Sequence, residues 1–151
     1  MKLSTKTRYG IRLLLDLARY HDQGPVQIGD IAKRQDISVK YLEQIVRPLK
    51  KAGLVCSIRG PKGGHLLGKA PEEISLDQIV RLLENESDMV ECVTDHQKCA
   101  RSNDCSVRLV WQEANRAFYE KLQSITITDL LVNDNTLERD ETTYSLRSKD
   151  S

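Results

Sequence analysis

Three cysteines with unequal spacing are the most chemically distinctive residues of this chain: Cys92, Cys99 and Cys105. Structural zinc usually takes four ligands, in pairs about two to four residues apart, so the gaps between these thiols are long for zinc. Iron–sulfur clusters accept thiolates at varied spacings and can take a fourth ligand that is not cysteine. The spacing alone therefore leaves an iron–sulfur cluster, zinc and unligated thiols open.

Two further residues bear on this thiol chemistry. His96 lies between the first two cysteines and can complete a site of three cysteines and one histidine, although a single loop histidine is more often simply exposed. Cys56 is expected on a strand, where the alternation of side chains points it inward. We therefore predict that Cys56 is a core residue and not a ligand.

A second set of polar side chains lies on a helix expected to begin after Ser38. Its apolar stripe, Leu42, Ile45 and Leu49, faces the core. The outward-facing residues are Ser38, Lys40, Tyr41, Glu43, Gln44 and Arg47. The first three can bond phosphates, whereas Gln44 and Arg47 can bond base edges and Glu43 can accept from the amino group of cytosine. This mixture suits a helix that reads the DNA major groove.

A basic, glycine-rich turn follows that helix between two expected strands. Arg59, Pro61 and Lys62 lie at its tip, where an arginine on a narrow loop can enter a minor groove. The turn leads into a strand and contains no GxxxxGK[ST] motif, so it is not a nucleotide-binding loop. Polar helix faces are usually only solvated, but the reading helix and the basic hairpin together favour DNA binding.

The distribution of charge agrees with that interpretation. The chain has 151 residues and a net charge of only +1. Residues 1–70 carry 14 basic and 5 acidic side chains, a net +9, whereas residues 71–151 carry 9 basic and 17 acidic ones, a net −8. The first half is thus predicted to bind an anion such as DNA, and the second half to stay away from phosphates.

The expected elements position both groups of residues. Three helices and then a two-stranded hairpin fill residues 1–70, an order typical of a winged helix-turn-helix. A helix over about 76–85, with a capping box from Ser75, precedes an irregular segment at 86–104 and a long helix at about 105–123. A short helix after a second capping box at Thr126 runs to about residue 132, and the polar tail 133–151 is expected to be disordered. The fold class is mainly α with a small β-hairpin, and the chain divides into 1–70, 71–132 and 133–151.

Other classes of protein are excluded on composition and pattern. No apolar run approaches the roughly 18 residues of a membrane span, and the N-terminus lacks a secretory signal, so we expect a cytoplasmic protein that does not contact membranes. His21, His65 and His96 are dispersed and no nucleophile–base motif occurs, so an enzyme is not expected.

The motifs taken together resemble a known family, the Rrf2-type winged helix-turn-helix transcription regulators. The resemblance covers about residues 1–132, and within the family the iron–sulfur cluster regulators of the IscR type are most similar. The motifs that carry it are Lys6-x-Arg8-Tyr9, Ile37-Ser38 with Tyr41-Leu42-Glu43-Gln44, Ala52-Gly53-Leu54-Val55, and Arg59-Gly60-Pro61-Lys62-Gly63-Gly64 with Leu66-Leu67-Gly68.

The resemblance implies a homodimer that binds a double-stranded DNA operator, with the helix from about Val107 to Leu122 at the dimer interface. Independently, the stripe of Val107, Val110, Trp111, Ala114, Phe118 and Leu122 has the near-heptad spacing of a helix with a partner. The resemblance also implies that Ser38, Tyr41, Glu43 and Gln44 read the major groove and that Arg59 enters the minor groove. The IscR type has a small polar residue where this chain has Lys40, so the preferred operator is expected to differ from that of the IscR type.

The resemblance further implies that Cys92, Cys99 and Cys105 hold an iron–sulfur cluster, either [2Fe–2S] or [4Fe–4S]. Arg108 stands where the IscR type has a histidine ligand, and arginine cannot ligate iron. The fourth ligand is therefore open: His96, Asp95, Asp104, a small exogenous molecule or a residue of the other subunit.

The implied function is a transcription regulator, expected to be a repressor, that responds to iron or cluster supply, nitric oxide or redox state. The alternative is a cluster-free regulator of the CymR type, whose cysteines sense oxidants or bind zinc or whose loop docks another protein.

Overall fold

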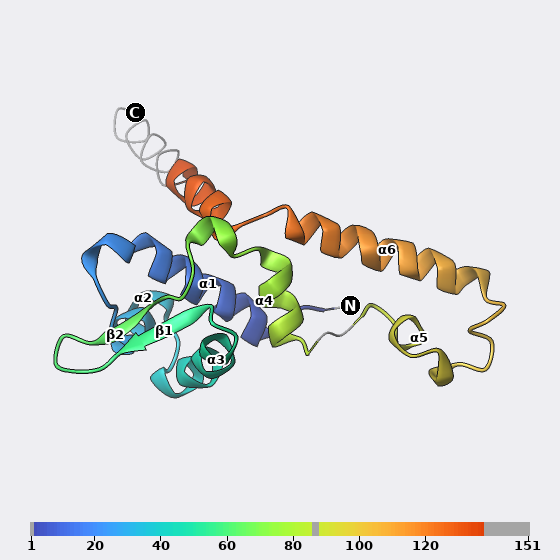
Figure 1. Ribbon diagram of the computed structural model, residues 1–151, viewed down its shortest axis with the longest axis horizontal. Coiled ribbons are helices and arrows are strands. Elements are labelled where there is room, and N and C mark those ends of the chain that lie inside the picture. Colours follow the sequence, from blue (N-terminus) through green and yellow to red (C-terminus); the bar gives the residue numbers. More distant parts are fainter. Residues whose placement is uncertain (1, 86–87, 138–151) are drawn as a thin grey trace, which may run out of the picture.

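The computed structural model describes residues 2–85 and 88–137, which form a compact N-terminal body and an extended arm (Figure 1). The body holds four helices and a hairpin, and the arm holds a short helix and a long one. The elements are α1 (Thr5–Arg19), η1 (His21–Gln23), α2 (Ile28–Gln35), α3 (Val39–Lys51), β1 (Val55–Ile58), β2 (Gly64–Leu67), η2 (Pro71–Glu73), α4 (Leu76–Leu83), α5 (Glu91–Thr94), η3 (His96–Lys98) and α6 (Ser106–Gln123).

The order of three helices and a hairpin confirms the expected winged helix-turn-helix. Ser4 and Ser38 cap α1 and α3 by accepting backbone N–H groups. β1 and β2 pair antiparallel, with Val55 opposite Leu67. On the other side of β2, Val26 and His65 exchange two backbone hydrogen bonds of 2.9 and 2.8 Å, which attach the hairpin to the segment before α2.

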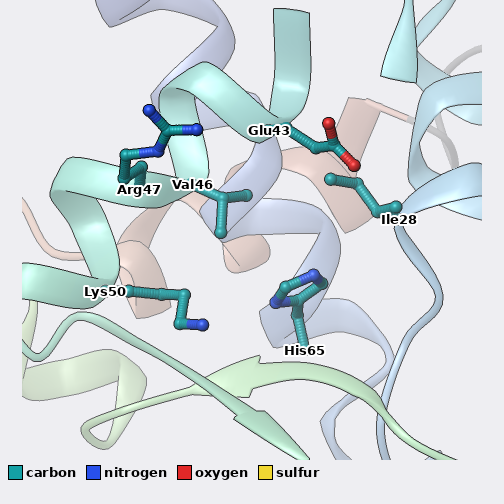
Figure 2. Close-up of a pocket in the computed structure, with 6 residues that line it drawn as sticks. All are labelled: Ile28, Glu43, Val46, Arg47, Lys50 and His65. Carbon is teal, nitrogen blue, oxygen red and sulfur yellow. The ribbon is translucent and has the colours of Figure 1, made fainter. Parts of the chain in front are cut away.

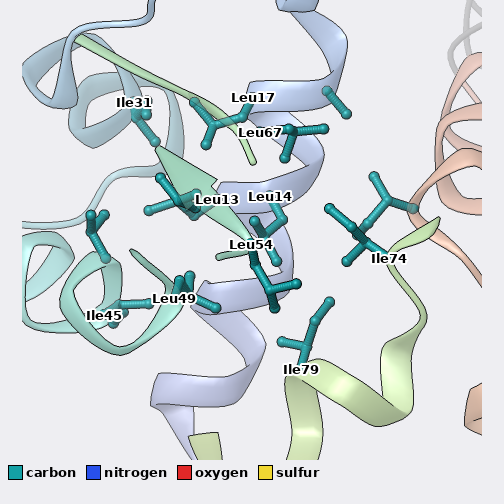
Figure 3. Packing of buried hydrophobic residues seen from close by; sticks show 14 of the residues in the cluster. Leu13, Leu14, Leu17, Ile31, Ile45, Leu49, Leu54, Leu67, Ile74 and Ile79 are labelled. Carbon is teal, nitrogen blue, oxygen red and sulfur yellow. The ribbon is translucent and has the colours of Figure 1, made fainter. Parts of the chain in front are cut away.

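The core of the body lies around α1, whose leucines are surrounded by the other elements (Figure 3). Leu13, Leu14 and Leu17 are fully buried, and Ile45 and Leu49 of α3 pack against them. Ile79 of α4 closes the same cluster from the other side. These residues recur at spacings of three and four, which is why the sequence pattern located the helices correctly.

Four details differ from the sequence-based expectation. The Ser75 capping box is wrong, because the Ser75 hydroxyl donates to Asp77 Oδ1 and accepts no backbone N–H. The segment expected to be irregular contains α5 and η3. Residues 127–137 are helical, so residues 133–137 of the expected tail have regular structure, while the rest of the tail lies outside the described residues. Cys56 is exposed and not a core residue, because Val55 is the residue of β1 that faces inward.

Within the described residues, no helix is both long and apolar enough to span a lipid bilayer.

A buried ion pair joins α1 to α2 and provides the first prediction. Asp16 is only 4% exposed and accepts bidentate hydrogen bonds of 2.9 and 2.7 Å from Arg34. Asp16→Asn is expected to lower the free energy of unfolding by about 2 kcal/mol, less than for a fully buried pair because Arg34 is partly solvated. Urea unfolding measures this change. The matched variant Asp22→Asn, at an exposed position, should leave the midpoint unchanged, and equal midpoints for the two variants would refute the assignment.

Candidate DNA-binding surface and cysteine loop

Helix α3 presents a polar face to solvent, as its sequence predicts. Lys40, Glu43, Gln44 and Arg47 are all exposed, while the opposite face of the helix is buried in the core. The Ser38 hydroxyl accepts from the Tyr41 N–H at 3.2 Å, and its own proton remains available to a phosphate. The expected reading residues therefore share one accessible helix surface.

Tyr41 differs from the other predicted reading residues because it is half-buried. Its ring packs edge-on against the ring of Tyr9 in α1, with the centroids 6.1 Å apart. Arg12 lies over the other aromatic ring of this pair, 5.3 Å from the centroid of Tyr9. This packing fixes the direction of the Tyr41 ring at the edge of the surface.

The hairpin tip is exposed and tightly folded. Arg59, Pro61 and Lys62 are all exposed, and the Gly63 N–H donates to the Gly60 carbonyl at 3.0 Å. A Cβ atom at Gly63 would lie 2.1 Å from the Ile58 carbonyl oxygen, so this position requires glycine. Gln27 donates to the Gly63 carbonyl at 2.5 Å and thereby fixes the tip against the N-terminus of α2.

The predicted cations of this surface are not neutralised within the body. Among the residues that the structure describes, Lys40, Arg47, Arg59 and Lys62 make neither an ion pair nor a side-chain hydrogen bond. Unpaired, exposed cations on a surface of net positive charge attract phosphate groups, at a strength that depends on salt.

A cavity of about 330 Å³ between α3 and the hairpin adds two residues to this surface (Figure 2). Lys50 and His65 line it together with Glu43 and Arg47. Neither Lys50 nor His65 was expected there, although the spacing of Lys50 from Glu43 and Arg47 places all three on one helix face. Burial lowers the pKa of His65, and the nearby Lys50 cation lowers it further, so the neutral ring is favoured at pH 7. The His65 Nδ1 lies 3.0 Å from the Ser57 hydroxyl.

The first residues of the cysteine loop, residues 88–105, are hydrogen-bonded to α6 through Asp88 and Met89. Asp88 Oδ1 accepts from the Asn115 amide of α6 at 2.7 Å, and Asp88 Oδ2 accepts from the Thr94 hydroxyl of α5 at 2.6 Å. The Asn115 carbonyl oxygen accepts in turn from the Met89 N–H. The beginning of the loop is thus tied to the middle of α6.

Arg108 of α6 contacts the loop at Cys92 and His96. This residue is only 6% exposed, and its Nε donates to the Cys92 carbonyl at 2.8 Å. One of its terminal nitrogens lies 2.6 Å from His96 Nε2. The Ser102 hydroxyl, also buried, donates to the His96 carbonyl at 2.6 Å. Arg108 therefore does not ligate metal but gathers the segments around Cys92 and His96 at the start of α6.

The three loop cysteines are free thiols that the structure does not bring together. Cys92 and Cys105 are half-buried and Cys99 is exposed. In the described ranges, no three side chains of Cys, His, Asp or Glu form a group that could hold a metal ion. Cys105 occupies the N-cap of α6, where its side chain accepts no hydrogen bond. Cys56 lies on β1, in the body, and its thiol is directed at the Leu67 carbonyl.

Helix α6 exposes most of its apolar residues. Tyr119 faces the body, under Arg81, whereas Leu109 and Val110 are 63% and 62% exposed. A shallow groove of about 540 Å³ runs along this outer face. Its lining residues are Leu109, Val110, Glu113, Ala114 and Ala117. Val107 and Trp111 extend the exposed apolar surface along the helix.

Comparison with known proteins agrees with these features. The chain is 45% identical over 131 residues to the protein rrf2 of Nitratidesulfovibrio vulgaris, covering 87% of each chain. It is 36% identical over 138 residues to the HTH-type transcriptional regulator IscR of Pectobacterium carotovorum, covering 91% of this chain and 84% of the relative.

Two solved structures share the fold. CymR, described as the global cysteine regulator of B. subtilis, has a TM-score of 0.74 at 39% identity, covering 88% of this chain and 98% of CymR. IscR of T. potens has a TM-score of 0.71 at 37% identity, covering 89% and 88%. Residues 3–133 match the Rrf2 family, described as iron-dependent transcriptional regulators. The winged helix-turn-helix, the relatives and this match together establish that the chain belongs to the Rrf2 family of transcription regulators and is not an enzyme.

Proposed function

We propose that this regulator binds its operator as a homodimer and that an iron–sulfur cluster in the cysteine loop controls this binding. The observation that carries the proposal is the position of the loop. Its thiols lie in α5, at the end of η3 and at the N-cap of α6, and α6 exposes an apolar face. A change in the loop therefore acts directly on the helix that would join two subunits.

The DNA-binding half of the proposal is supported by the geometry of α3 and the hairpin. Gln44, Arg47 and Glu43 would contact base edges, while Ser38, Lys40 and Tyr41 would contact phosphates. Arg59, Pro61 and Lys62 at the hairpin tip would lie in the adjacent minor groove. Two such modules, related by a two-fold axis, fit a pseudo-palindromic operator whose half-sites are separated by whole turns of DNA.

The donor set of the loop fits an iron–sulfur cluster. Three free thiols on one segment match the thiolates that such clusters require, and both [2Fe–2S] and [4Fe–4S] types accept three cysteines with a different fourth ligand. Because the thiols are separate in the described structure, the loop must close to hold the cluster. When bound, the cluster would provide an iron- and redox-responsive crosslink between α5, η3 and α6.

Hydrogen bonds near both ends of the arm attach it to the body that carries the reading surface. Glu84, at the end of α4, accepts from both the N–H and the hydroxyl of Ser4 at the start of α1, at 2.8 and 2.7 Å. After α6, Ile125 and Ile127 hydrogen-bond to Leu76 and Ile74. Both ends of the arm are therefore fixed to the body, so a change in the arm alters the relative orientation of the two reading helices. The cluster and the operator then affect each other's affinity by the same factor.

In this proposal the protein acts in the cytoplasm, where DNA and reduced thiols occur together. The signal is iron or cluster supply, nitric oxide or redox state, each of which changes the cluster. Repression is the expected outcome, because a dimer bound across a promoter excludes polymerase from the same DNA. Anaerobic purification followed by visible absorbance and counting of iron and sulfide tests the proposal; a colourless, iron-free protein would refute it.

A cluster-free thiol- or zinc-dependent regulator is the second candidate. The similarity to CymR of B. subtilis and the separation of the three thiols favour it. Metal analysis distinguishes the two, because the first candidate requires both iron and sulfide, whereas the second requires zinc or no metal at all.

Glu43 provides a prediction about operator choice. A carboxylate on the reading helix repels phosphate and accepts from the amino group of cytosine, so it rejects unsuitable sites. Glu43→Ala is expected to broaden the set of bound operators, measured by selection from a randomised operator pool. Glu72→Ala, an exposed acid of η2, is the matched control and should leave the preference unchanged. An unaltered preference in Glu43→Ala would contradict the role.

A further inference from the structure

The contacts of Arg108 are unusual for a buried cation. Arg108 is 6% exposed, and no carboxylate among the described residues lies within ion-pairing distance of it. Burying a charge without a counter-charge is costly. Its guanidinium is instead held by two neutral acceptors, the Cys92 carbonyl and the ring of His96. The hydrogen bond to His96 uses the Nε2 lone pair, which is also the atom with which histidine ligates metals.

The backbone around His96 is held as firmly as its ring. The Ser102 hydroxyl, on a residue 6% exposed, donates to the His96 carbonyl at 2.6 Å, and the Ser102 N–H donates to the Cys99 carbonyl at 3.1 Å. One buried serine therefore fixes both His96 and Cys99 in the same turn. Arg108 and Ser102 together therefore connect the segments that carry Cys92, His96 and Cys99 to one another.

If His96 is counted as a ligand, the long gap between Cys92 and Cys99 is divided into two shorter gaps. Three residues separate Cys92 from His96, and two separate His96 from Cys99. Both gaps lie in the range of about two to four residues that is typical of paired metal ligands. Asp95 is less suitable as a ligand, because its Oδ1 accepts from the Gln97 N–H at 2.9 Å and caps η3.

From these contacts we infer that His96 is the fourth ligand of the loop, and that Arg108 holds the His96 ring in place while no metal is bound. The inference rests on the proposed function for the identity of the bound group. When a cluster is bound, the Nε2 lone pair of His96 would bind iron and would no longer accept from Arg108. The Nδ1 proton would stay on the His96 ring, and the Arg108 guanidinium would keep all its protons. Arg108 is thus a positioning residue that competes with the metal for one lone pair.

Isotope-labelled histidine provides the direct test. The chain has only three histidines, and His21, in η1 of the body, is an exposed control. With ¹⁵N-histidine incorporated, pulsed EPR of the reduced, loaded protein should show coupling to a ligand nitrogen in wild type and in His21→Ala. His96→Ala should lose that coupling. A wild-type cluster without nitrogen coupling, or coupling that persists in His96→Ala, would overturn the inference and leave the cluster itself established.

A double variant with histidine at position 108 in place of position 96 tests whether the two positions face the same metal site. His96→Ala should shorten the lifetime of the bound cluster at least about tenfold, as expected for losing a metal ligand. The double variant His96→Ala, Arg108→His should recover most of that lifetime, because position 108 faces the same space. No loss in His96→Ala would refute the ligand role, and no recovery in the double variant would refute the shared site.

Zinc separates failure of this inference from failure of the proposed function. Zn²⁺ added to the metal-free protein should bind to the three thiols and His96, with an affinity at least about tenfold higher than in His96→Ala. A protein that holds no cluster but shows this difference would refute the cluster and support the ligand set. Equal Zn²⁺ affinities would overturn the ligand set.

Discussion

Replacing Cys92, Cys99 and Cys105 together by alanine is expected to reduce bound iron and sulfide to background. The operator affinity of this variant should be the same with and without an iron chelator. Iron–sulfur clusters are held mainly by thiolates, and Cys92, Cys99 and Cys105 are the thiols of the loop, so their removal leaves too few ligands to hold a cluster. The measurement is iron and sulfide content after anaerobic purification, with operator binding in the presence and absence of an iron chelator.

The fourth cysteine provides a matched control for that triple variant. Cys56 is an exposed thiol on β1, in the body and outside the cysteine loop. Cys56→Ala should therefore keep the wild-type content of iron and sulfide. Iron that persists in the triple variant, or iron that is lost in Cys56→Ala, would contradict the assignment of the site to the loop.

Placing two carboxylates on the exposed face of α6 is the second change with a large expected effect. Leu109 and Val110 line the groove on that face, and an interface there would bury them. In Leu109→Glu, Val110→Glu, association would bury two unpaired charges, so the protein should sediment as a monomer. Operator affinity should then fall about a hundredfold or more, because the second half-site is no longer bound at a high effective concentration.

A charge at the C-terminal end of α6 controls for added negative charge on the helix. Gln123→Glu changes an exposed residue at the end of the helix, beyond the groove. It should sediment as the wild type does and bind the operator with unchanged affinity. A double variant that remains dimeric, or that binds a full operator as tightly as wild type, would show that this face does not join the subunits.

The body of the protein could be predicted from sequence because its elements obey local rules. Leu42, Ile45 and Leu49 recur at helical spacing, and Ser38 supplies a cap before them. The glycine-rich segment between two apolar runs indicated a hairpin, which the register of Val55 and Leu67 confirms. The outward face of α3 followed from the same periodicity, so its exposed residues could be named in advance.

The features that the sequence did not predict depend on contacts between distant residues. Arg108 could be excluded as an iron ligand, but its hydrogen bonds to Cys92 and His96 required the loop to be folded back on α6. His65 joins the cavity beside α3 only because β2 crosses near that helix. The Ser75 capping box failed because the Ser75 side chain is turned toward Asp77, two residues further on, and accepts no backbone N–H.

The central claim, that a cluster in the loop controls DNA binding, is tested most directly by one measurement. The operator affinity of a single anaerobic preparation should be determined at fixed salt before and after the iron is removed by a chelator. The proposal predicts an affinity difference of about fivefold or more between the loaded and metal-free forms of the wild type, the range of ordinary allosteric coupling. Identical affinities of the two forms would contradict it.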